Sequence, residues 1–154
     1  MADSLTIRNK EYVKSTEVEQ LAADVIAEKT LDVSPARIKY LLIYPHINKT
    51  TAGRCNKATN LLKFYGEVDY VIELSGEFYD QLDKDRRKIL LWHELLHVHP
   101  IINEKTGEWE FKIRKHDIGD FATIINEYGV KWISEFKTIF SSVYDLDNLN
   151  ELSL

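Results

Sequence analysis

Cysteine is almost absent from this chain of 154 residues, which contains only Cys55. A single cysteine excludes an internal disulfide, and it also excludes a four-cysteine zinc site or an iron–sulfur cluster held within the chain. No apolar run approaches the roughly 20 residues that cross a bilayer, because the longest, such as 40–45, suit a protein core. The six glycines and three prolines are scattered. Composition therefore indicates a globular protein without a linker or a membrane segment.

Positive charge is not in excess either. Twenty basic and 25 acidic residues give a formal net charge of −5, which does not favour nucleic acid as a partner, although a local basic patch is compatible with that sum. The first ten residues lack the apolar stretch of a secretory signal. We therefore expect a cytoplasmic protein with one domain over 1–144 and an acidic tail over 145–154.

The hydrophobic pattern predicts an alternation of helices and strands. The predicted helices and strands do not alternate regularly along the chain. Their order therefore favours the α+β class over a doubly wound sheet. Thr16 and Glu19 have the spacing of a capping box, Pro100 is expected to end the central helix, and 46–60 is expected to be a loop. The elements that we predict are a helix over 15–29, strands over 38–44, near 61–65 and over 68–74, a helix over 84–98, a strand over 108–115, and helices over 117–128 and from Trp132 to Val143.

One motif in the central helix is typical of metal chemistry. His93 and His97 are four residues apart in His93-Glu94-Leu95-Leu96-His97. At about 100° per residue they lie one turn apart on one face of a helix, so both imidazoles can reach one metal ion. Glu94 lies about 100° further round the helix than His93, so it is not well placed to bind the same metal ion. It can instead hydrogen-bond a water held on the metal and take its proton. The alternative is that the two histidines flank a leucine-rich core helix and bind nothing.

A third ligand has to come from outside this motif. The candidates are His116, Glu104 and Asp120. His116 is favoured because it lies at a predicted strand-to-helix junction, and Asp117 or Asp120 can orient its other ring nitrogen. His99 is expected to point away from the metal face, near the end of the helix.

The motifs together resemble the putative phage metallopeptidase family. Members pair a His-Glu-Leu-x-His helix with a downstream His-Asp-x-x-x-Phe and a Tyr-Gly-x-x-Trp segment, and this chain has HELLH at 93–97, HDIGDF at 116–121 and YGVKW at 128–132. The resemblance covers about 38–133. It implies a minimal zincin-like domain, with a small mixed sheet packed on the N-terminal and HExxH helices and with further helices towards the C-terminus. It also implies a phage origin, and hence the cytoplasm of the host cell.

A broader likeness connects the chain to SprT-type zinc proteases. Those proteins share the Thr-Ala-Gly-x-Cys segment found at 51–55 and the IELS strand end found at 72–75. By that analogy Zn²⁺ is bound by His93, His97 and His116, with Glu94 as general base and Phe121 packed under the third ligand. Two features depart from the likeness: Asp117 stands where those proteases usually have glycine, and the C-terminal zinc ribbon that binds DNA is absent.

The sequence thus predicts a zinc metallopeptidase that acts on a protein or peptide substrate, with the substrate extended along the edge of the sheet that contains the strand over 68–74. Two alternatives remain at this stage. One is a non-catalytic zinc-containing binding or regulatory module of phage origin, and the other is a SprT-like, DNA-associated protease. Cys55 as a ligand or redox group, Arg54 as a substrate contact, and a basic surface over 84–88 are weaker candidates, each with an ordinary structural explanation.

Overall fold

The computed structural model describes residues 4–115, 124, 127–129 and 131–144. A five-stranded mixed sheet has the strand order β1-β2-β3-β5-β4, and β6 and β7 form a separate hairpin. The strands are β1 (Ser4–Ile7), β2 (Lys10–Val13), β3 (Ile38–Tyr44), β4 (Gly53–Lys57), β5 (Tyr70–Ser75), β6 (Val98–Ile102) and β7 (Trp109–Ile113). The described helices are α1 (Thr16–Glu28), α2 (Asn60–Gly66), α3 (Gly76–Gln81), α4 (Lys84–Leu96) and α6 (Lys131–Tyr144). The α+β class and the mixed sheet are as predicted.

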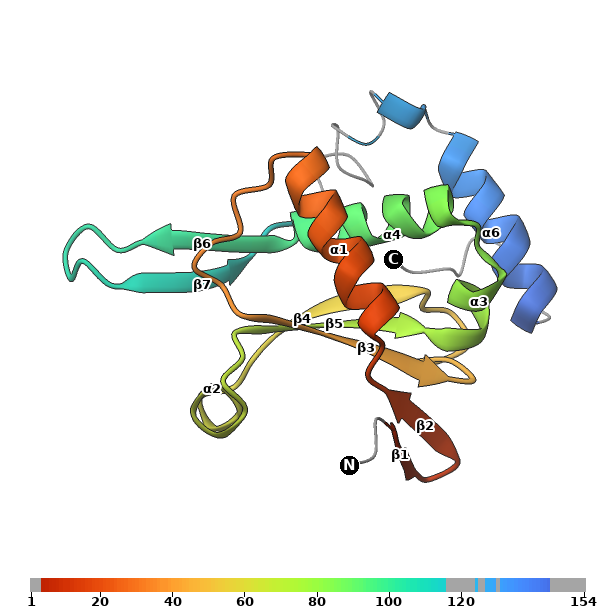
Figure 1. Cartoon of the computed structure of the whole chain (residues 1–154), viewed down its shortest axis with the longest axis horizontal. Coiled ribbons are helices and arrows are strands. Elements are labelled where there is room, and N and C mark those ends of the chain that lie inside the picture. Colours follow the sequence, from red (N-terminus) through yellow and green to blue (C-terminus); the bar gives the residue numbers. More distant parts are fainter. Residues whose placement is uncertain (1–3, 116–123, 125–126, 130, 145–154) are drawn as a thin grey trace.

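The helices α1 and α4 cover one face of the sheet, and α2 lies on the other side (Figure 1). Side chains alternate along β3 and β5, so that Tyr40, Leu42, Ile72 and Leu74 all point into the core under these helices. The α1 helix contributes its apolar stripe of Val18, Leu21, Ala22 and Val25, each buried. Burial of this stripe holds α1 against the sheet, because apolar area removed from water contributes about 25 cal/mol per Å².

The C-terminal helix α6 packs beside α3. The Phe136 ring lies 5.8 Å from the Phe78 ring and 4.9 Å from the Trp132 ring, measured between centroids. The helix therefore closes the end of the core that lies beyond α4, as the periodicity of its apolar residues predicts.

Several local predictions are wrong. The segment near 61–65 is helical rather than extended, because Thr59 caps α2 by accepting a hydrogen bond from the Leu62 N–H. The expected loop over 46–60 contains β4, which pairs along the whole of its length with β5. Ser15, not Thr16, caps α1. The hairpin of β1 and β2 was not predicted at all.

The central helix is also shorter than predicted. It ends at Leu96, and β6 begins two residues later and contains Pro100. Proline is tolerated there because β6 pairs with β7 on one side only, so its missing N–H interrupts no second ladder. Of the predicted helix over 117–128, only positions 124, 127 and 128 belong to the part of the chain that the structure describes, and all three are helical. The boundary of the domain at residue 144 and the acidic tail stay predictions.

Candidate metal centre

The helix α4 carries the candidate metal-binding residues near its C-terminal end. Asp83 caps its first turn by accepting a hydrogen bond from the Arg86 N–H at 2.8 Å. Leu90, Leu91 and Leu95 are buried in the core and fix the rotation of the helix about its axis. His93 and Glu94 then lie on its buried side, and His97 follows as the C-cap with helical backbone angles.

His93, Glu94 and His97 form one compact group. One ligand atom from each residue lies within 4.8 Å of the others, and among the residues that the structure describes this is the group that could hold a metal ion. The two imidazole rings are 5.3 Å apart and inclined at 77°. His97 Nε2 lies 4.0 Å from Glu94 Oε1. The two imidazole nitrogens are donors that Zn²⁺ binds in proteins, and the Glu94 carboxylate lies close enough to act on a water beside such an ion.

The three residues of this group differ in how far they are buried. His93 is 1% exposed and Glu94 is 0% exposed, whereas the His97 side chain is partly accessible. A metal ion held here would therefore be enclosed on the side of His93 and reachable on the side of His97. A carboxylate with no solvent contact is costly in an apolar core unless polar or charged groups compensate it, so Glu94 is better suited to an ion-binding site than to a packing role.

His97 is oriented by the backbone that follows β7. Its Nδ1 atom lies 2.7 Å from the carbonyl oxygen of Arg114, and the Arg114 N–H donates to the His97 carbonyl at 2.8 Å. A carbonyl can only accept, so Nδ1 carries the proton and Nε2 keeps its lone pair towards Glu94 and a metal. This outer contact is typical of histidine ligands in metal sites. No sequence pattern could have indicated Arg114, because the contact is made by its backbone.

His93 packs against Trp132 of α6. The two rings are 5.9 Å apart between centroids, and Trp132 is buried. Sequence periodicity predicts Trp132 only as a core residue of the last helix. The contact with His93 arises from the way α6 crosses the end of α4, which no local pattern specifies.

The strand β4 passes beside Glu94, and its first residue has to be small. A Cβ atom added at Gly53 would lie 3.1 Å from Glu94 Oε2 and 3.2 Å from Leu74 Cδ2. Cys55 points to the same side, and burial, with a further contribution from the nearby Glu94 charge, raises the pKa of its thiol well above the usual range. Cys55 is thus a protonated packing residue, and it is not part of the group of potential ligands.

The other candidate residues lie elsewhere. Glu104 is exposed in the turn between β6 and β7, at the opposite end of the hairpin from His97. His99 lies in β6, and its Nδ1 atom is 3.0 Å from Arg114 Nη2. Arg54 points to the opposite face of the sheet from Glu94 and pairs with Glu73 at 2.9 Å. His116, Asp117, Asp120 and Phe121 lie outside the described residues.

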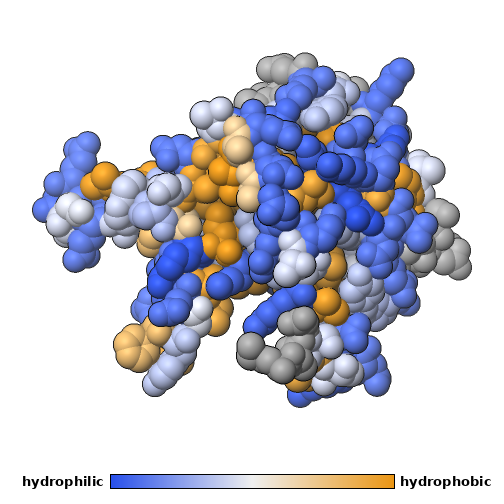
Figure 2. Space-filling model, in the orientation of Figure 1, coloured by the Kyte–Doolittle hydropathy of each residue, from blue (hydrophilic) through white to orange (hydrophobic). Residues whose placement is uncertain are grey.

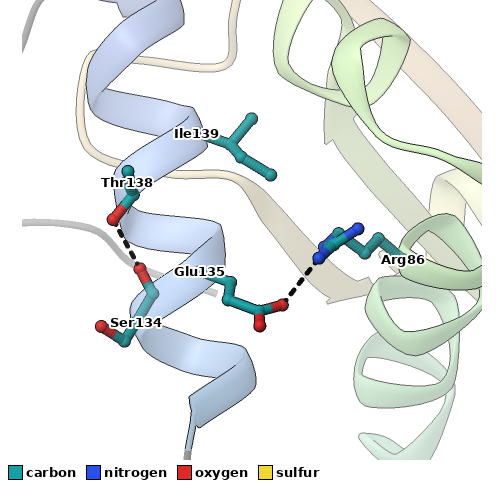
Figure 3. Close-up of a pocket in the computed structure, with 5 residues that line it drawn as sticks. All are labelled: Arg86, Ser134, Glu135, Thr138 and Ile139. Carbon is teal, nitrogen blue, oxygen red and sulfur yellow. Dashed lines mark hydrogen bonds and ion pairs between the residues drawn. The ribbon is translucent and has the colours of Figure 1, made fainter.

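Three of the four basic residues at the start of α4 pair with acidic side chains. Arg86 pairs with Asp83, three residues earlier in the chain, at 2.7 Å. It also pairs with Glu135 of α6 at 2.9 Å, across a pocket between α4 and α6 (Figure 3). Arg87 pairs with Glu17, and Lys88 with Glu28. These ion pairs are a structural explanation for Arg86, Arg87 and Lys88 of the basic run.

The fold and the site define a small α+β domain with a His-Glu-His group suited to a metal ion. The sequence model of the putative phage metallopeptidase family matches residues 10–144, and the chain belongs to this family. No curated protein and no solved structure gives a significant match. Family membership indicates a metal-dependent peptidase. None of the helices in the described ranges is long and apolar enough to cross a membrane.

Proposed function

We propose that the protein is a zinc-dependent peptidase whose centre is built on the last turn of α4. The observation that carries this proposal is the gathering of His93, Glu94 and His97 within 4.8 Å, in a chain of the putative phage metallopeptidase family. His93 and His97 would hold the zinc ion together with His116. In support of His116, it follows Arg114 by two residues in the chain, and the Arg114 carbonyl contacts His97.

Bound zinc would supply Lewis acidity towards a peptide carbonyl and towards water, whose pKa such a site lowers to about 7. Glu94 takes the proton of the attacking water on a carboxylate oxygen and returns it to the leaving amine. Its buried position beside His97 suits this role. Arg114 keeps the His97 ring in one tautomer through its carbonyl, and Trp132 limits movement of the His93 ring.

The substrate would add a strand to the sheet at β4. The sequence predicts a substrate along the edge of the sheet that contains the strand over 68–74. In that sheet β5 lies between β3 and β4, and β4 is the edge next to it. A strand at the edge of a sheet has main-chain N–H and C=O groups that no second strand pairs, and an extended peptide can pair with them. Because β4 starts beside Glu94, a peptide paired with it would run past the proposed centre.

The test compares two Glu→Gln substitutions. Glu94→Gln removes the proposed base, whereas Glu73→Gln alters a glutamate that pairs with Arg54 on the other face of the sheet. We expect Glu94→Gln to keep about one zinc per chain and to cleave unfolded casein roughly 10²–10⁴ times more slowly, the usual contribution of a general base. Glu73→Gln should cleave at the wild-type rate.

Full activity of Glu94→Gln would contradict the role of Glu94. A wild-type protein that binds zinc but cleaves neither casein nor a mixed peptide library would instead favour a non-catalytic zinc module. Cleavage that depends on DNA and falls steeply with salt would favour the DNA-associated alternative.

A further inference from the structure

The hairpin of β6 and β7 depends on contacts with the rest of the fold. The two strands form a sheet of their own, and a hairpin of two strands is at best marginally stable by itself in water. It projects beyond the end of α4 (Figure 1), and Figure 2 shows apolar side chains gathered where it joins the body of the molecule. Ile102 and Trp109 near its tip are 54% and 44% exposed, whereas Val98 at its base is buried. The hairpin is therefore attached through its base.

Tyr70 connects the hairpin to the five-stranded sheet. It lies in β5 and is fully buried. Its hydroxyl donates to the carbonyl oxygen of Lys112 at 2.7 Å, and its ring meets the Phe111 ring edge to face at 6.0 Å. Burial raises the pKa of Tyr70 to about 12, and a hydrogen bond from the backbone of His99 has a smaller, opposing effect. The hydroxyl therefore stays protonated at neutral pH, and it contacts both strands where His99 opposes Lys112.

Other contacts at the base of the hairpin are less directional. The Lys63 ammonium group of α2 lies 5.4 Å from the centre of the Phe111 ring, and β7 lies against β4. Packing contacts of this kind tolerate some sliding and tilting, whereas a hydrogen bond weakens steeply when its distance or angle changes. The Tyr70 hydroxyl therefore has the larger part in determining where the hairpin lies on the sheet.

The contact at Lys112 is close to the candidate metal centre. Arg114 follows Lys112 by two residues, which is about 7 Å of extended chain. The Arg114 carbonyl lies 2.7 Å from His97 Nδ1, and the Arg114 N–H donates to the His97 carbonyl. The His97 ring belongs to the end of α4, whereas the Arg114 carbonyl belongs to the chain that leaves β7. Because these are different elements, the contact between them depends on the position of the hairpin relative to α4.

We propose that Tyr70 is a positioning residue of the centre on α4, because its hydroxyl holds the hairpin on the sheet and so keeps the Arg114 carbonyl at Nδ1 of His97. This inference rests on the proposed function in so far as His97 is a zinc ligand. Loss of a group that orients a histidine ligand weakens metal binding by about 10- to 100-fold. Tyr70 acts one step further from the ligand, so we expect its hydroxyl to contribute less, about three- to tenfold.

The experiment compares two buried tyrosines. Tyr70→Phe removes the hydroxyl and keeps the ring that packs on Phe111. Tyr79→Phe is the matched control, because Tyr79 is 1% exposed and its hydroxyl donates to Glu17 of α1 at 3.1 Å. Each variant loses one hydrogen bond of a buried hydroxyl, so both should show a similar, small decrease in the midpoint of urea unfolding. Only Tyr70→Phe should alter His97.

Two measurements distinguish positioning from stability. Long-range ¹⁵N–¹H NMR spectra of the metal-free protein at pH 8 should show His97 protonated on Nδ1 in the wild type and in Tyr79→Phe. Tyr70→Phe should show a mixture with the tautomer protonated on Nε2. Competition with a chromogenic chelator should show zinc binding weakened about three- to tenfold in Tyr70→Phe alone. An unchanged tautomer or an unchanged zinc affinity in Tyr70→Phe would overturn the inference, and so would equal changes in Tyr79→Phe.

A second variant decides the question if Tyr70→Phe does not fold. Phe111→Leu loosens the same attachment from the side of the hairpin, so it should shift the His97 tautomer in the same direction, and an unchanged tautomer would overturn the inference. Failure of the proposed function is read separately. A wild type that binds no zinc, or that binds zinc and cleaves no peptide, would contradict the proposed function. The NMR comparison in the metal-free protein would still decide the role of Tyr70.

Discussion

His97 Nδ1 lies 2.7 Å from the carbonyl oxygen of Arg114, and this contact connects the end of α4 to the chain beyond β7. The hairpin of β6 and β7 returns the backbone to His97 after leaving it at Val98. The hairpin therefore determines which ring nitrogen of His97 faces Glu94. In the metal-free protein this relationship predicts that His97 is the tautomer with its proton on Nδ1.

Long-range ¹⁵N–¹H NMR spectra of the imidazole groups test this prediction. At pH 8 in the presence of a chelator, the His97 cross-peaks should show the pattern of a protonated Nδ1 and an unprotonated Nε2. His46 lies outside the ligand group. The spectrum of His46→Gln identifies the cross-peaks of His46, because they disappear in that variant. A His97 ring protonated on Nε2 would contradict the proposed orientation.

Gly53→Ala should displace Glu94 and leave the metal ligands in place. The added Cβ would lie 3.1 Å from Glu94 Oε2, 3.2 Å from Leu74 Cδ2 and 3.4 Å from the Glu73 carbonyl. A shift of a reacting group by about 1 Å costs up to about 100-fold in rate, so we expect peptide cleavage to fall by about 10- to 100-fold at unchanged zinc content. Gly66→Ala is the control. Its added Cβ would also lie 3.1 Å from a neighbour, but that neighbour is the Leu62 side chain of α2 and not Glu94. Equal activities of the two variants would contradict the role of Gly53.

Trp132→Leu should weaken zinc binding beyond its effect on stability. Trp132 contacts both His93 and Phe136, whereas Phe136 contacts Trp132 and Phe78. Each core substitution to Leu should cost about 1–3 kcal/mol of unfolding free energy. Only Trp132→Leu should also lower zinc affinity, by about tenfold, because His93 loses a neighbour that restrains its ring. Competition with a chromogenic chelator measures the affinity. Phe136→Leu with the same loss of affinity would show a merely structural effect.

Asp69 connects the starts of β3 and β5 and should make stability depend on pH. Burial raises the pKa of its carboxyl, but hydrogen bonds and charge from Arg37 outweigh this and hold the pKa below the usual value. The stabilisation is therefore present above about pH 4, the unfolded pKa, and it is lost as the pH falls through the lower folded pKa.

The measurement is urea unfolding of Asp69→Asn against the wild type. We expect a loss of about 2 kcal/mol at pH 7, a typical value for hydrogen bonds to a charged group, and a difference that shrinks steadily below pH 4. Asp24→Asn, which changes a partly exposed carboxylate on α1, should have little effect at either pH. A pH-independent difference would contradict the ion-pair explanation.

The sequence predicts best those features that local pattern determines. The strand over 38–44 has the predicted bounds because its apolar side chains serve both sheet pairing and the core. His93 and His97 come together because helical spacing alone brings them to one face. That they bind zinc with His116 stays a prediction.

The features that sequence pattern missed depend on partners distant in the chain. The strand β4, with the sequence GRCNK, has little strand propensity of its own and is extended because it pairs with β5. In α2 a short apolar and aromatic run reads equally well as a strand, and the cap at Thr59 decides for helix. The order of the strands in the sheet is also beyond local pattern, because nothing in the sequence near β4 or β5 specifies that β4 lies at the edge.

The central claim is that α4 carries a zinc site in which Glu94 is the general base and not a zinc ligand. The most direct measurement is the zinc content of the untagged protein by elemental mass spectrometry, after removal and restoration of zinc, in the wild type, His93→Ala, His97→Ala, His116→Ala and Glu94→Gln. We predict about one zinc per chain in the wild type and in Glu94→Gln, and a sharp loss in each histidine variant. A wild type that binds no zinc, or histidine variants that retain it, would contradict the account.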